Sequence, residues 1–199
     1  MQLILTFVLA AQLAAAPHPP HGPLCAEARA WADSHREAAT FFAASSQGET
    51  YEPSAATWRR YESFKAFRES DVPGSIFYSA ELWRAPGDVL VVSTTESSFS
   101  GDWSLYTTYC FDSAGRLLSL QSELRMLPSH AITRQHLLFD VSGNRVRTNI
   151  SYNDLSSGAA LRGRGLQEAR AYQVPLRIYS RVKELPFASL LPVAPSHSQ

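Results

Sequence analysis

A turn that occurs twice constrains the fold of this chain more than any other feature. Residues 111–116 (FDSAGR) and 139–144 (FDVSGN) share the form Phe-Asp-x-x-Gly. Aspartate at the start of a turn accepts hydrogen bonds from the amides that follow, and glycine at its fourth position adopts a positive φ without steric cost. Such a turn closes a β-hairpin, so each of the two predicts a pair of antiparallel strands. The four expected strands are residues 103–111, 116–127, 131–139 and 145–152.

Further strands are predicted on both sides of these hairpins. Large and small side chains alternate along residues 75–84, and residues 89–98 are rich in Val and Thr, which favour strands. Residues 171–182 alternate again after a Gly-rich loop at 156–165. Short turns between successive strands predict an antiparallel β-meander of about seven strands.

Helical patterns precede the strands. Residues 25–44 are rich in Ala and Glu, which are good helix formers, and they place Trp31 and Phe42 on one face. Residues 54–70 carry an aromatic side chain at every third position, which gives a helix one apolar face. Helices followed by strands are typical of an α+β fold. We expect two N-terminal helices packed on a twisted antiparallel sheet, with a half-barrel as a variant.

The first residues of the chain predict export. Residues 1–16 contain no charged side chain, and an apolar core at 3–11 leads to three alanines. This pattern is typical of a cleavable signal peptide and is too short for a membrane span, so we expect a periplasmic or extracellular protein with no transmembrane span in the mature chain. A buried N-terminal helix is the alternative. Because Pro17 follows Ala16 and hinders cleavage there, the exact cleavage site stays open.

The expected organisation of the chain is a signal peptide at residues 1–16, a Pro-rich linker at 17–24, a single α+β domain at 25–185 and a flexible C-terminal tail at 186–199.

Cys25 and Cys110 are the two cysteines of the chain. In an oxidising compartment they are able to pair, and the bond would join the first helix to a central strand. It requires the first helix to cover the sheet face that carries Cys110. Two unpaired, partly buried thiols are the alternative.

Composition excludes some classes of function. The 199 residues carry 18 basic and 18 acidic side chains, so no overall positive charge attracts nucleic acid. No Gly-rich phosphate loop, zinc-ligand spacing or nucleophile elbow occurs, and we expect neither a cofactor nor a metal site.

The candidate site residues follow from the strand patterns. The strand at 75–84 has large side chains on both faces, which indicates either that both faces are covered or that one face lines a groove. The candidates for ligand binding are Tyr78, Trp83, Tyr106 and Arg134, and those for proton transfer are His136, Glu81 and Glu96. The sequence favours a non-catalytic exported binding or scaffold module that contacts a small apolar ligand or a protein. The alternative is an exported hydrolase-like or isomerase-like enzyme with a half-barrel pocket.

Overall fold

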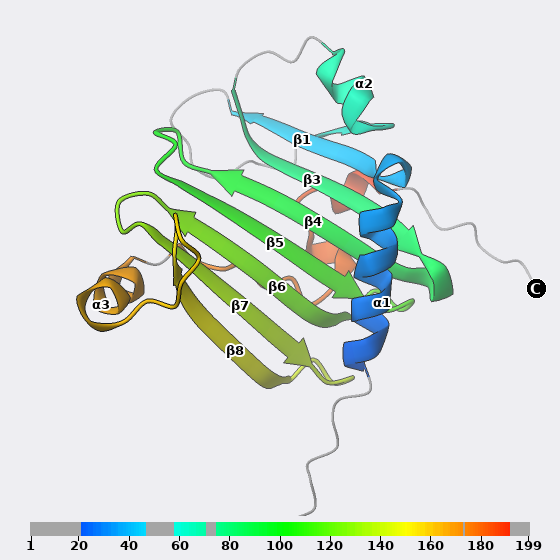
Figure 1. Ribbon diagram of the computed structural model, residues 1–199. Coiled ribbons are helices and arrows are strands. Elements are labelled where there is room, and N and C mark those ends of the chain that lie inside the picture. The colour runs from blue at the N-terminus through cyan, green and yellow to red at the C-terminus, as the bar shows by residue number, and fades with distance from the viewer. Residues whose placement is uncertain (1–20, 47–57, 71–74, 173, 192–199) are drawn as a thin grey trace, which may run out of the picture.

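The fold is built on one antiparallel sheet of eight strands (Figure 1). The structure, a computed structural model, describes residues 21–46, 58–70, 75–172 and 174–191. The strands are β1 Thr40–Ser46, β2 Trp58–Tyr61, β3 Ser75–Ala85, β4 Val89–Ser97, β5 Trp103–Phe111, β6 Leu117–Met126, β7 Ala131–Phe139 and β8 Arg145–Asp154. Their order is β2-β1-β3-β4-β5-β6-β7-β8, so β3 to β8 form the predicted meander. The sheet is open and does not close into a barrel.

The helices differ from those predicted. They are α1 His21–Ser34, α2 Phe64–Arg68 and α3 Gly163–Ala171. The first helix ends at Ser34, ten residues before Ala44, where its predicted end lies. Residues 40–46 instead pair with β3 as strand β1. The second predicted helix is wrong over residues 58–61, which form strand β2. Of its described residues, 58–70, those of α2 are helical, and residues 54–57 lie outside the described part of the chain. Pairing with neighbouring strands overrides the local helical preference in both places.

The last predicted strand, at residues 171–182, is also absent from the described structure. Residue 171 ends α3, and residues 174–179 run across the sheet without regular structure. The described part of this segment has one isolated bridge to the sheet, between Arg116 and Arg181. Leu176, Tyr179 and Val182 pack against the core, so alternation in the sequence reflects contact with the sheet from one side and not pairing within it.

Two layers cover the two faces of the sheet. Helix α1 lies across one face, which we call the helix face, and it packs on Trp83, Val91 and Cys110. Residues 174–191, which we call the strap, lie across the other face, the strap face (Figure 1). Coverage of both faces explains why β3 carries large side chains on each of them. The strap includes Phe187, which is fully buried, whereas the sequence predicts a flexible tail from residue 186 onward.

Of the two alternatives that the sequence leaves open for the cysteines, the structure has the disulfide. Cys25 of α1 is bonded to Cys110 of β5, and both side chains are fully buried. Helix α1 therefore covers the face on which Cys110 lies, as the bond requires. The bond closes a loop of 85 residues that includes strands β1 to β4 and fixes α1 to the middle of the sheet.

The two predicted hairpin turns are confirmed. The Asp112 carboxylate accepts hydrogen bonds from the amides of Ala114 at 3.0 Å and Arg116 at 2.8 Å. Asp140 accepts equivalent bonds in the turn between β7 and β8. Gly115 and Gly143 have φ values of 72° and 85°, the left-handed conformation that glycine adopts without strain.

Replacing either turn glycine by valine should destabilise the protein. A β-branched residue is strained at positive φ, and we expect Gly115→Val and Gly143→Val each to cost about 1–3 kcal/mol of unfolding free energy. Gly115→Val should cost more, because its Cβ would already contact Val182 Cγ2 at 3.5 Å and the γ-methyl groups of valine would crowd that side chain, whereas nothing lies within 4 Å of a Cβ at Gly143. Thermal melts of both variants within error of the parent would contradict the expectation.

Candidate functional site

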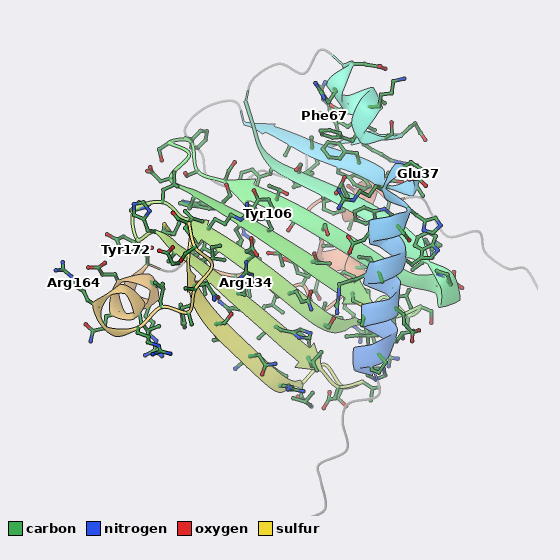
Figure 2. The ribbon with its side chains drawn as sticks, in the orientation of Figure 1. Glu37, Phe67, Tyr106, Arg134, Arg164 and Tyr172 are labelled. Carbon is green, nitrogen blue, oxygen red and sulfur yellow. A yellow bond between two sulfur atoms is a disulfide. The ribbon has the colours of Figure 1, made fainter. Side chains whose placement is uncertain are left out.

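A polar groove lies on the helix face of the sheet, beside α1. It has a volume of about 480 Å³ and its floor is formed by β5, β6, β7 and β8. Figure 2 shows Tyr106 and Arg134 on this open part of the face, away from the helix. The side chains of this polar groove are Tyr106, Thr108, Gln121, Glu123, Arg134, His136, Asn149 and Ser151.

Strand register places these side chains in two rows across the sheet. Residues directly opposite each other on neighbouring strands point to the same face. Thr108, Gln121, His136 and Asn149 are successive partners in one row. Tyr106, Glu123, Arg134 and Ser151 are successive partners in the next. Continuous ladders between the four strands hold the rows in place, so the floor of the groove is rigid.

A carboxylate held by two arginines occupies the centre of the second row. Glu123 accepts hydrogen bonds from Nε of Arg125 and from Nε of Arg134, each at 2.7 Å. Partial burial opposes ionisation of Glu123, but the two guanidinium groups outweigh it and lower the pKa of its carboxyl. The Arg125 guanidinium also lies 5.2 Å from the centre of the Tyr106 ring. This cluster fixes the orientation of both arginines and of the exposed tyrosine.

His136 lies in the first row and is the most unusual group of the groove. Its Nε2 is buried and has no hydrogen-bond partner among the described residues. Burial lowers the pKa of its imidazole, and the positive charges of Arg29 and Arg147 lower it further. The imidazole is therefore neutral near pH 7.

The three candidate proton carriers are not brought together. Glu81 shares the helix face with His136, but β4, β5 and β6 separate their strands. Glu96 lies on the strap face, where it lines a small hollow with Arg177. Burial raises the pKa of both carboxyls, partly offset by Arg36 at Glu81 and by Arg177 at Glu96.

The four candidate ligand-binding residues divide between the two faces. Tyr106 and Arg134 line the polar groove, as just described. Trp83 is buried beneath α1, and its indole Nε1 donates a hydrogen bond to the His35 carbonyl at 3.1 Å. Tyr78 is buried on the strap face. The structure therefore places the first two at the groove and the other two in the core.

A second hollow lies at the β1 end of the helix face. It has a volume of about 590 Å³ and combines Glu81 with the aromatic rings of Phe41, Phe64 and Phe67. Figure 2 shows Phe67 and Glu37 at this end of the molecule. The three rings pack on one another, with Phe41 centred 5.3 Å from Phe64 and 4.7 Å from Phe67. They stabilise the edge of the sheet and offer few hydrogen-bonding groups.

Sequence reasoning missed Glu123, Gln121 and Asn149. The register of the β5–β6 hairpin, which the turn at 111–116 predicts, would have placed Glu123 opposite Tyr106. The register between β6 and β7 depends on the turn at 127–130, which has no such signature in the sequence.

Comparison of the chain with protein-family models, with curated proteins and with solved structures finds no match. Among the residues that the structure describes, no group of three His, Cys, Asp or Glu side chains is arranged to hold a metal ion. No helix in the described part of the chain is long and apolar enough to cross a membrane.

Proposed function

We propose that this protein is an exported, non-catalytic binding module whose polar groove takes a small hydrogen-bonding ligand. The observation that carries the proposal is the cluster of Glu123, Arg125, Arg134 and Tyr106, a set of oriented polar groups on a rigid floor. Binding sites depend on such preorganised groups, because orienting them on binding would cost free energy. The Cys25–Cys110 disulfide and the apolar segment at residues 1–16 support export.

Arg134 is suited to contact the ligand directly. Its Nε donates to Glu123, and its Nη1 lies 3.5 Å from Asn153 Oδ1. A guanidinium has five N–H groups, and among the described residues no further acceptor takes those that remain. The side chain lines the groove and is about half exposed, so a ligand there can reach it. Because most of the lining side chains carry hydrogen-bonding groups, the ligand we propose carries such groups too, in addition to the apolar surface expected from the sequence.

The enzyme alternative lacks a comparable observation. General acid–base catalysis requires a proton carrier within hydrogen-bonding reach of its partner. His136 has no carboxylate bonded to it among the described residues, and Glu123 is held by two arginines. A panel of chromogenic ester, phosphate and glycoside substrates tests this alternative. Turnover that disappears in His136→Ala would favour the enzyme.

Ligand-observed NMR with a library of small carboxylates, phosphates, sugars and amides tests the binding proposal. We expect hits whose affinity falls at least about tenfold in Arg134→Gln, because a hydrogen bond to a charged donor contributes about 1.5–3 kcal/mol. Arg164→Gln is the matched control, since Arg164 lies on α3 with a side chain 90% exposed. Hits that bind both variants equally well would place binding outside the polar groove.

A further inference from the structure

Two arginines lie near His136 just beyond the lining of the polar groove, on the side of α1. Ser119, Leu138 and Arg147 form the next row of the sheet beyond His136 in the direction of the helix. Arg29 of α1 lies above this row, because its Nη1 donates a hydrogen bond to Ser119 Oγ at 3.1 Å. Arg29, Arg147 and His136 therefore come from three elements and meet around Leu138.

Arg29 is a partly buried cation without a bonded counter-ion. Burial lowers the pKa of its guanidinium, and the charge of Asp33 on the same helix only partly compensates. In the described part of the chain Arg29 forms no ion pair, and its one side-chain hydrogen bond goes to a neutral hydroxyl. A buried charge in this state is costly, and an anion placed beside it is stabilised more strongly than in water.

Arg147 adds a second positive charge from the edge strand. It is exposed, and it too has no ion pair with any described carboxylate. The nearest acidic group of the groove is Glu123, which two other arginines already neutralise. The α1 end of the groove is consequently positive, although the whole chain has no net charge.

His136 completes the set with a buried nitrogen that lacks a partner. An unsatisfied buried polar atom is uncommon, and each one calls for a physical explanation. The amide side chains of Gln121 and Asn149 stand on either side of it in the same row. Other atoms of the ring line the groove, so an anion there would lie beside the imidazole and within reach of the two amides.

We propose that Arg29, His136 and Arg147 form an oxyanion subsite that binds the carboxylate or phosphate group of the ligand. The subsite rests on the proposed binding function and specifies the ligand class: a small molecule with an anionic group at its α1 end and hydrogen-bonding groups toward Tyr106 and Arg134. Arginine suits either oxyanion because its planar N–H fork matches both.

Binding at this subsite is coupled to protonation of His136. The groups that face the imidazole are Arg29 from α1, Glu123 from β6, Arg147 from β8 and Arg134 two residues away on β7. Without an anion, burial and the two cations favour the neutral imidazole. A bound oxyanion favours the charged form, so it raises the pKa of His136, and by linkage its affinity increases as pH falls.

NMR titration of the His136 imidazole in the intact protein tests the subsite. Inorganic phosphate and succinate are added in parallel at constant ionic strength, with chloride as the reference. We expect a saturable shift of the His136 signals and a rise in the pKa of His136 with at least one oxyanion, and the comparison shows which of the two binds. Arg147→Gln and Arg29→Gln should each weaken binding at least about tenfold.

Arg145→Gln is the matched control. Arg145 lies on the same strand as Arg147 but lines the hollow on the strap face. The substitution therefore removes the same charge as Arg147→Gln without changing the subsite. Since Arg147 is exposed, Arg147→Gln keeps the test decisive even if Arg29→Gln fails to fold. No saturable shift in the parent protein, or equal weakening by Arg145→Gln, would overturn the subsite. Library hits that depend on Arg134 would still support the binding function in that case.

Discussion

Replacing Cys25 and Cys110 together by alanine is expected to lower the unfolding free energy by about 4–5 kcal/mol. The bond closes a loop of 85 residues, and the entropy that such a cross-link removes from the unfolded chain increases with loop length. In a domain of this size, each kcal/mol shifts Tm by roughly 2–4 °C, so Tm should fall on the order of 10 °C. Thermal and urea unfolding of the parent and the double variant measure the effect.

Reduction of the parent protein is the control for the substitutions themselves. Reduced and alkylated parent should unfold near the Tm of the double variant, and a Tm within 2 °C of the oxidised parent would contradict the expectation. Mass spectrometry of the exported protein belongs to the same experiment. Alkylation of two thiols without reductant would contradict the disulfide. A mass that includes residues 1–16 would contradict the predicted signal peptide.

The strands from β3 to β8 were predictable because local and long-range requirements agree there. Side chains alternate at the period of a strand, and Asp112 and Gly115 specify the turn that joins β5 to β6. The turn at Asp140 does the same for β7 and β8. Each hairpin forms between neighbouring segments, so the local signal is sufficient to predict the pairing.

The first two strands were not predictable from local signals. Residues 40–46 (TFFAASS) form strand β1 because β2 and β3 pair with them, one on each side. The residues paired between β1 and β3 are on average more than thirty positions apart in the sequence. Phe41 and Phe42 then point to opposite faces, toward the aromatic hollow and toward the strap. A helix would have placed the two rings about 100° apart on one side, so only the tertiary contacts separate the alternatives.

The polar groove was predictable in part. Tyr106 and Arg134 were identified as candidates, and the hairpin register connects Tyr106 with Glu123. The position of Arg29 near His136 could not be predicted from the sequence, because it depends on how α1 crosses the sheet. The disulfide fixes that crossing by joining Cys25, one helical turn before Arg29, to the central strand β5.

The packing of the strap, at the C-terminal end of the described chain, was not predictable from local sequence either. Phe187 is the residue through which we expect the strap to contribute most to stability. Residues 174–191 contain no strand or α-helix, yet they bury apolar side chains along the strap face. Phe187 is fully buried, and its ring lies 4.5 Å from that of Phe42 and 5.0 Å from that of Trp58. It therefore joins the strap to β1 and β2, the strands that local sequence does not specify.

We expect Phe187→Ala to lower the unfolding free energy by about 3–5 kcal/mol, because it removes the ring and leaves a cavity among aromatic neighbours. Ile178→Ala is the control on the same strap, where the side chain is 46% exposed, and it should change stability by no more than about 0.5 kcal/mol. Urea unfolding measures both. Small and equal changes in unfolding free energy would mean that the strap is not anchored through Phe187. A large loss of unfolding free energy in Phe187→Ala alone assigns the C-terminal segment to the cooperative core that holds β1 and β2 in the sheet.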